Sequence, residues 1–221
     1  LQRQFRSLVD AGFKSVVVEV SSHALSQHRV TGTEFDVGVF TNLSKDHLDF
    51  HNDIEEYFET KRSLFSADRC RSAVVNIDDP YGSRLAKLID IETYKTSASA
   101  VEIEIESFSG SSIIWRGRTI ELQVSGKFNI DNALLAASTC LLLGVDENYI
   151  ANGLEVAKPV PGRFEVVDGH ERAPKVIVDY SHTPAGIENV LQAVRRINPD
   201  AGITIVFGCG GERDKPKREI M

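Results

Sequence analysis

The sequence predicts an α/β fold: a mostly parallel sheet with a small antiparallel meander, followed by the start of a second, Rossmann-like unit. Short apolar runs at 16–20, 35–40 and 73–77 are rich in β-branched residues and lack polar alternation, which is typical of parallel strands covered on both faces. Stretches with helical spacing separate these runs. Near 101–106, apolar and acidic residues alternate, which indicates antiparallel strands with one solvated face.

Residues 1–13 are predicted to be the end of an amphipathic helix. Phe5, Leu8 and Val9 would face inward, and Gly12 would end the helix in a left-handed conformation. The strand at 16–20 would follow and complete an α/β unit.

The strand at 35–40 opens into a polar loop over 41–49. This loop lies at the carboxyl end of the strand, where ligands bind in open α/β sheets. A helix over 53–66 is predicted next, and Lys61 lies on its apolar stripe. The stripe comprises Ile54, Tyr57, Phe58, Leu64 and Phe65. An ammonium in that position must extend to solvent, pair with an acid or lose its charge.

The strand at 73–77 is followed by a predicted capped helix. Asp79 is a candidate N-cap, Pro80 would take the first helical position, and the helix would run through Ile89. The meander is predicted over 93–124. Trp115 within it is expected to pack in the core, because no interleaved basic and aromatic residues surround it.

The apolar helix predicted at 133–143 is preceded by two asparagines. Asn129 and Asn132 could simply cap that helix. After a further short helix, the proline and glycine stretch 158–162 is predicted to be a hinge, and we place the domain boundary there, between a first domain, 1–160, and a second, 161–221. Arg163 follows it directly and could be a surface arginine of a linker.

The second domain is predicted to open with a right-handed β-α-β unit of Rossmann type. A strand at 176–178 ends at Asp179, a helix runs to Ile197, and a further strand covers 203–207. The glycine-rich loop after it, beginning at Gly208, does not have the G-x-G-x-x-G order of dinucleotide sites.

The composition excludes some classes of function. With 221 residues, of which 42% are hydrophobic, the chain can bury a real core. Its formal net charge of −7 argues against general binding to nucleic acid or anionic membranes. Three widely separated cysteines fit a reducing compartment, and no apolar run is long enough to cross a bilayer. We therefore expect a cytoplasmic monomer that acts on small molecules.

A carboxylate, an imidazole and an inward lysine occur together in the first part of the chain. Glu19 alone could be a buried acid bonded to backbone amides, His47 a core histidine, and Lys61 a lysine reaching solvent. Their coincidence at the ends of adjacent elements favours a divalent-metal site. Magnesium prefers oxygen ligands, so a lysine fits this set only as a carbamate, the oxygen anion that a neutral amine forms with carbon dioxide.

The stretches EVSSHALSQHRV, FTNLSKDHLDFH and YFETKRSLF resemble the central domain of the Mur ligase family, in particular its MurE type. GKFNIDN, DYSHTP and FGCGGERDKPKR resemble later blocks of the same family, with serine at 181 where the family has alanine. The resemblance covers nearly the whole chain. It implies an ATP- and Mg²⁺-dependent ligase of peptidoglycan synthesis that adds a third amino acid, meso-diaminopimelate or lysine, to UDP-MurNAc-L-Ala-D-Glu through an acyl phosphate.

The resemblance also implies roles for individual residues. Metal ligands would be Glu19, His47 and carbamylated Lys61, which are also the catalytic set. Nucleotide contacts would come from Asn129, Asn132, Arg163, Asp179 and His182. The nucleotide-sugar substrate would contact Ser21, Gln27 and Arg29, and the incoming amino acid would contact Arg218.

No G-x-x-x-x-G-K-[ST] loop occurs in the sequence, although an ATP-using ligase of this type needs one to hold the phosphates. We therefore expect a fragment that lacks this loop, the preceding sugar-nucleotide domain and the later half of the second domain, and that is inactive alone. Three alternatives remain: a folylpolyglutamate or cyanophycin type of ligase, a non-catalytic MurE-like interaction protein, and a nucleotide- or metal-binding module without chemistry.

Overall fold

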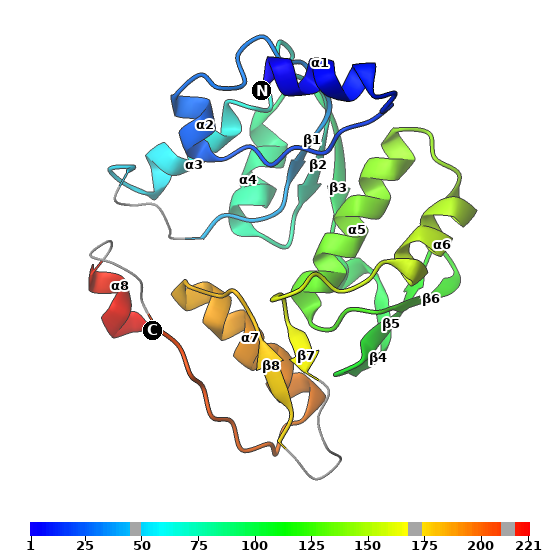
Figure 1. The fold of residues 1–221 in the computed structure, drawn as a ribbon, viewed down its shortest axis with the longest axis vertical. Helices are drawn as coiled ribbons and strands as arrows, with labels where there is room; N and C mark the ends of the chain where they lie inside the picture. Colours follow the sequence, from blue (N-terminus) through cyan, green and yellow to red (C-terminus); the bar gives the residue numbers. More distant parts are fainter. Residues whose placement is uncertain (45–49, 168–173, 209–214) are drawn as a thin grey trace.

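The computed structural model describes residues 1–44, 50–167, 174–208 and 215–221. Its centre is a parallel sheet in the order β1-β2-β3, made of Phe35–Phe40, Cys70–Asn76 and Glu92–Thr96. Helices α3 (Ile54–Arg62) and α4 (Pro80–Leu88) lie on one side, and α5 (Lys127–Leu142) packs on all three strands from the other (Figure 1). This is the predicted α/β architecture.

The core residues of the sheet explain why these segments form it. Ala73, Val74 and Val75 are fully buried in β2, as expected for a central parallel strand covered on both faces. On the α3 and α4 side, Phe40 and Phe58 belong to one apolar cluster. In α3, Asp53 accepts a hydrogen bond from the Glu56 amide and begins the helix as its N-cap.

Helix α4 begins as the sequence predicts. Asp79 accepts a hydrogen bond from the amide of Gly82 at 2.9 Å, and Pro80 occupies the first helical turn. The other carboxylate oxygen of Asp79 accepts from the amide of Leu43 at 3.3 Å. The same cap therefore also holds the start of the loop after β1.

The antiparallel meander is confirmed, but it starts later than predicted. Strands β4 (Glu102–Ser107), β5 (Gly110–Trp115) and β6 (Arg118–Leu122) form it, after a 3-10 turn, η1 (Ala98–Ala100). Residues 93–96, assigned to the meander from the sequence, instead belong to β3 (Glu92–Thr96), the edge strand of the parallel sheet. Trp115 packs in a second apolar cluster between the meander, α5 and α6 (Glu147–Val156), as predicted.

Two predicted strands are not strands in the structure. Residues 16–20 and 203–207 are extended but have no strand pairing, and Val17 and Val206 are almost fully exposed. A strand needs a neighbour for its backbone hydrogen bonds, and in the described residues neither segment is paired with another strand. An apolar run indicates which backbone shape is favoured, but it does not supply the partner.

The second predicted unit is therefore also different. Strand β7 (Glu165–Val167) pairs antiparallel with β8 (Val176–Val178), and α7 (Pro184–Ile197) follows β8. The helix is confirmed, whereas the predicted right-handed β-α-β unit is wrong because residues 203–207, which the structure describes, do not form its second strand.

The ends of the chain carry short helices. Helix α1 (Gln2–Asp10) stops before Gly12, which has a φ of +84°, as predicted. Its apolar side is not buried, however, and Val9 is 62% exposed, which corrects the predicted inward face. Helix α8 (Lys215–Ile220) ends the chain beside the start of α7 in Figure 1. In the part of the chain that the structure describes, no helix is long and apolar enough to cross a membrane.

Candidate functional site

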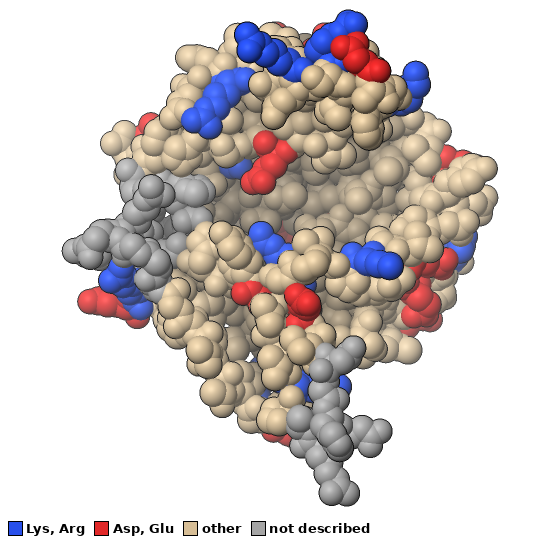
Figure 2. Space-filling model, in the orientation of Figure 1, with Lys and Arg blue, Asp and Glu red and all other residues tan. Residues whose placement is uncertain are grey.

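A cavity of about 720 Å³ lies at the carboxyl ends of β1 and β2, between the sheet, the start of α5 and α7. Figure 2 shows the molecule hollowed between the part that carries the parallel sheet and the part that carries α7. Thr41 and Asn42 enter the cavity wall from the end of β1, and Asn76 from the end of β2. The volume suits a ligand of small-molecule size.

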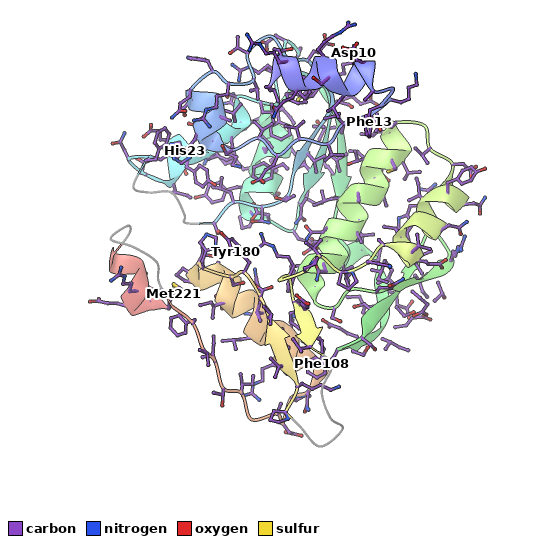
Figure 3. All side chains as sticks on the ribbon, viewed as in Figure 1. Asp10, Phe13, His23, Phe108, Tyr180 and Met221 are labelled. Atoms are coloured by element: carbon purple, nitrogen blue, oxygen red, sulfur yellow. The ribbon has the colours of Figure 1, made fainter. Side chains whose placement is uncertain are left out.

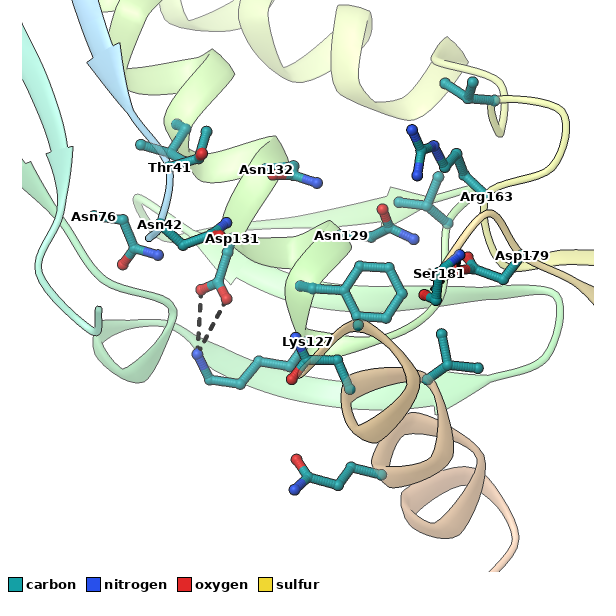
Figure 4. A pocket seen from close by; sticks show the side chains of 18 of the residues that line it. Thr41, Asn42, Asn76, Lys127, Asn129, Asp131, Asn132, Arg163, Asp179 and Ser181 are labelled. Atoms are coloured by element: carbon teal, nitrogen blue, oxygen red, sulfur yellow. Dashed lines mark hydrogen bonds and ion pairs between the residues drawn. The ribbon is translucent and has the colours of Figure 1, made fainter. Parts of the chain in front are cut away.

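The start of α5 supplies two of the predicted ligand-binding residues. Helix α5 begins at Lys127 with Gly126, at a φ of +91°, as its N-cap, so Asn129 and Asn132 lie inside the helix and are not its caps. Both line the cavity (Figure 4). The side-chain amide of Asn129 donates to the carbonyl of Ser125 at 2.7 Å, whereas Asn132 is exposed.

The hinge supplies the opposite wall. Arg163 and Asp179 both line the cavity (Figure 4), and the Arg163 guanidinium lies 4.7 Å from the centre of the Tyr180 ring. Tyr180 lies near the start of α7 (Figure 3). His182 is not part of the lining. Its ring packs 5.2 Å from that of Tyr180, and its Nδ1 is 3.1 Å from the Tyr180 carbonyl oxygen.

A cluster of three charges forms part of the cavity wall and was not predicted. Nζ of Lys127 donates to Asp78 at 3.0 Å and to Asp131 at 3.2 Å. Burial works to raise the pKa of Asp78, but hydrogen bonds from Ser97 and Lys127 outweigh it and lower that pKa. Burial raises the pKa of Asp131, and the nearby charge of Asp78 adds to the effect.

The pKa values of the two carboxyl groups shift in opposite directions because burial dominates at Asp131, whereas at Asp78 the hydrogen bonds from Ser97 and Lys127 outweigh it. The only sequence signal for this cluster is the spacing of Lys127 and Asp131, which places them one helical turn apart. Nothing in the sequence pairs either residue with Asp78.

Lys61 is half-buried on α3, as its place on the apolar stripe predicts. Burial lowers the pKa of its ammonium, and the Glu19 carboxylate partly opposes this. Two of the three predicted metal ligands, Glu19 and Lys61, therefore interact electrostatically in the structure. His47 lies outside the described residues. Among the residues that are described, no group of three or more His, Cys, Asp or Glu side chains could hold a metal ion.

The predicted substrate residues Ser21, Gln27 and Arg29 lie on either side of α2 (Ser22–Ser26). Ser21 is the N-cap, whose hydroxyl accepts from the Ala24 amide at 3.1 Å, and Gln27 ends the helix. Arg29 follows in an exposed turn and reaches the helix through its amide, which donates to the Ala24 carbonyl. Arg218 is exposed on α8, well separated in the chain from these residues.

A buried polar contact joins α2 to α3. Nε2 of His51 lies 2.9 Å from the Ser22 hydroxyl, and both side chains are almost completely buried. The His51 ring stacks on Tyr57 at a centroid distance of 5.0 Å. The segment with the predicted substrate residues is therefore fixed against the helix that carries Lys61. His51 was not among the site residues predicted from the sequence.

The chain matches two family models. Residues 1–140 match the Mur ligase middle domain, and residues 162–221 match the model described as Mur ligase, glutamate ligase domain.

Two curated relatives that are similar to the whole of this chain are ligases. The chain is 45% identical over 237 residues to UDP-N-acetylmuramoyl-L-alanyl-D-glutamate--2,6-diaminopimelate ligase of Geobacter metallireducens, covering 100% of this chain and 46% of that protein. It is 42% identical over 234 residues to the ligase of the same name from Trichormus variabilis, covering 100% of this chain and 47% of that protein. The chain thus spans about half the length of these relatives.

Solved structures show the same fold. A structure described as UDP-N-acetylmuramoyl-L-alanyl-D-glutamate--2,6-diaminopimelate ligase superimposes with a TM-score of 0.64 at 30% identity, over 92% of this chain and 44% of that one. The ligase MurC of Thermotoga maritima superimposes with a TM-score of 0.55 at 25% identity, over 75% of this chain and 39% of that one.

Proposed function

Since this chain belongs to the Mur ligase family, we propose that it forms part of an ATP-dependent ligase of peptidoglycan precursor synthesis. The ligase adds a third amino acid to UDP-MurNAc-L-Ala-D-Glu in the cytoplasm. The names of the curated relatives support 2,6-diaminopimelate as this amino acid. We place the two functional units at 1–160 and 161–221, on either side of the hinge.

The observation that carries this proposal is the convergence of separate segments on one cavity. Asn129 and Asn132 approach it from α5, and Arg163 and Asp179 from the hinge and the end of β8. Amide side chains suit an adenine edge, and a guanidinium suits phosphate oxygens. We assign these four residues to the ATP site, with Asn132 at the adenine and Arg163 at the phosphates. We also assign His182 to the nucleotide, although its side chain does not line the cavity in this structure and packs against Tyr180.

Lys61 and Glu19 support a magnesium site. The lowered pKa of Lys61 increases the fraction of neutral amine, and a neutral amine is the form that adds carbon dioxide, releases a proton and becomes a carbamate. The resulting oxygen anion beside Glu19 has the chemistry that Mg²⁺ prefers. We assign Glu19, His47 and carbamylated Lys61 as its ligands. When bound, the metal offsets negative charge during phosphoryl transfer.

The chemistry is the formation of an acyl phosphate. The substrate carboxylate attacks the γ-phosphorus of ATP, ADP leaves, and the amine of the incoming amino acid then displaces phosphate to form the amide. No side-chain nucleophile is needed, so the protein acts mainly by positioning and by charge. We assign Ser21, Gln27 and Arg29 to the nucleotide-sugar substrate and Arg218 to a carboxylate of the amino acid.

The test is a turnover assay on a protein of the length of the curated relatives that carries this chain. ATP, UDP-MurNAc-L-Ala-D-Glu and either meso-diaminopimelate or lysine are supplied, and ADP and the tripeptide product are measured. We expect ADP release that depends on the diamino acid. Tight nucleotide binding without any product would instead identify a binding module. In a parallel assay, a folate and glutamate replace the nucleotide-sugar substrate and the diamino acid, and product there would identify the folylpolyglutamate type of ligase.

A further inference from the structure

The hinge between α6 and β7 has a backbone conformation that is uncommon for its residues. Gly162 has a φ of +70° and Phe164 a φ of +46°. Glycine adopts such angles easily, but in a phenylalanine the Cβ atom crowds the neighbouring carbonyl oxygen. Surrounding contacts must therefore hold Phe164 in this conformation.

The carboxylate of Asp179 makes the main contact. One oxygen accepts a hydrogen bond from the backbone amide of Phe164 at 2.7 Å. The other accepts from the amide of Ser181, also at 2.7 Å, and from the Ser181 hydroxyl. Strands β7 and β8 pair Glu165 with Val178, so Phe164 lies opposite Asp179, one step beyond the ladder. At this position the Phe164 amide donates to the side chain of Asp179 and not to a backbone carbonyl of the opposite strand.

This contact fixes more than one residue. The amide of Phe164 belongs to the planar peptide that joins it to Arg163. Holding that plane restricts ψ of Arg163 and φ of Phe164 together. The two side chains then leave the hinge in set directions: the guanidinium stacks over Tyr180, and the buried Phe164 ring packs against Phe128 of α5 at a centroid distance of 5.9 Å.

We propose that Asp179 is a positioning residue, which holds the Arg163–Phe164 peptide and so orients Arg163 at the cavity. This inference rests on the proposed nucleotide site and assigns Asp179 a different task within it. Both oxygens of the carboxylate are taken up by the chain's own donors. A carboxylate directed at a polyphosphate would also repel it. Asp179 therefore acts on the nucleotide through Arg163.

Hydrogen exchange in the Asp179→Asn variant of this chain tests the proposal without any nucleotide. An asparagine has a single acceptor oxygen. Ser181 offers two donors to that oxygen, so the NH₂ group of the asparagine turns toward Phe164. The backbone amide of Phe164 then loses its hydrogen-bond acceptor. We expect the Phe164 amide to exchange about tenfold faster or more, the size expected for losing one charge-assisted hydrogen bond. NMR spectra of the core amides confirm that the variant is folded.

Ser181→Ala is the matched control. It removes the hydroxyl donor and keeps the backbone amide, so the Phe164 amide should exchange as in the original chain. An unchanged exchange rate in Asp179→Asn would overturn the proposal, as would an equal acceleration in Ser181→Ala.

NMR titration with ADP then separates this inference from the proposed function. We expect Asp179→Asn and Arg163→Met to weaken ADP binding, and the double variant to be no weaker than Arg163→Met alone. Additive losses would mean that Asp179 contacts the nucleotide directly, which overturns the positioning role and leaves the ATP site intact. Absence of ADP binding both in the original chain and in a protein of the length of the relatives would count against the ATP site, while the exchange experiment would still decide the role of Asp179 in the hinge.

Discussion

Arg196 on α7 and Glu106 on β4 form a two-point ion pair that ties the last long helix to the meander. Nε of Arg196 donates to one carboxylate oxygen at 3.1 Å, and Nη2 donates to the other at 3.4 Å. The Glu106 side chain is only 13% exposed, whereas that of Arg196 is 41% exposed. The carboxylate therefore depends on the arginine for compensation of its charge.

Replacing Arg196 should destabilise the protein. We expect Arg196→Met to lower the free energy of unfolding by roughly 1–2 kcal/mol, because it leaves a mostly buried carboxylate without its charged partner. Urea unfolding measures the change. Arg6→Met is the matched control, since the Arg6–Asp10 pair is exposed on both sides and should contribute little. Equal losses in the two variants would contradict the assignment, as would an undiminished effect of Arg196→Met in a Glu106→Gln background.

The Cys70 thiol should be unreactive in the folded protein. Burial raises its pKa to about 11, and the side chain has no exposed surface. At pH 8 it is therefore protonated and inaccessible to a thiol reagent. In a Cys209→Ser background, the half-buried Cys140 should react in the native state, and Cys70 only after unfolding. Fast native labelling of Cys70, located by mass spectrometry, would refute the prediction.

The same pKa shift gives a pH dependence of stability. The pKa of Cys70 is higher in the folded protein than in the unfolded chain. The contribution of the protonated thiol to the free energy of unfolding is therefore complete below about pH 9 and is lost as the pH rises through about 11. The urea midpoint of the original chain should therefore fall more steeply over this interval than that of Cys70→Ala.

The sequence predicts those elements whose signal is local. The buried strand β2 follows from its β-branched run, and α4 from Asp79 and Pro80 at its start. The strands expected at 16–20 and 203–207 fail because strand formation depends on a neighbour, which an apolar run does not specify. The apolar residues of these runs favour a strand, but whether a partner strand lies beside them depends on the tertiary structure.

In the candidate site too, the sequence predicts individual residues but not the contacts between distant segments. Asn132, Arg163 and Asp179 were selected by their resemblance to family motifs, and they do line one cavity. The ion cluster of Lys127 with Asp78 was missed, because it joins residues 49 positions apart. The hydrogen bond from Phe164 to Asp179 was missed for a related reason: it depends on the register of β7 against β8. Such contacts become visible only once the elements are assembled.

Arg218 should affect the incoming amino acid more than ATP. In a protein of the length of the relatives, we expect Arg218→Ala to raise the KM for the diamino acid at least about tenfold, as expected for losing one pairing with a carboxylate. The KM for ATP should change little. Arg6→Ala, at an exposed position on α1, provides the control. A parallel rise in both KM values would count against this role.

Lys61 should carry a carbamate. Its Nζ lies 5.8 Å from the centre of the Tyr57 ring, and burial lowers its pKa. In ¹³C-bicarbonate, NMR should show a carbamate resonance that grows as the pH rises and the neutral amine becomes more abundant. Lys61→Arg should abolish this resonance, because a guanidinium keeps its charge. The exposed Lys87→Arg on α4 should leave it unchanged.

Because the pKa of Lys61 is lowered in the folded protein, its titration also determines whether stability rises or falls with pH. Between the lowered pKa of the folded protein and the ordinary lysine pKa of 10.5, the unfolded chain holds more protons than the folded one, so the stability of the original chain should rise with pH in this window. Lys61→Met removes that slope. It should also unfold at higher urea near pH 7, where folding must otherwise bury an ammonium. A Lys61→Met protein that is less stable at pH 7 and keeps the same slope would show that the ammonium is well compensated in the fold, and the driving force for carbamate formation would then be absent.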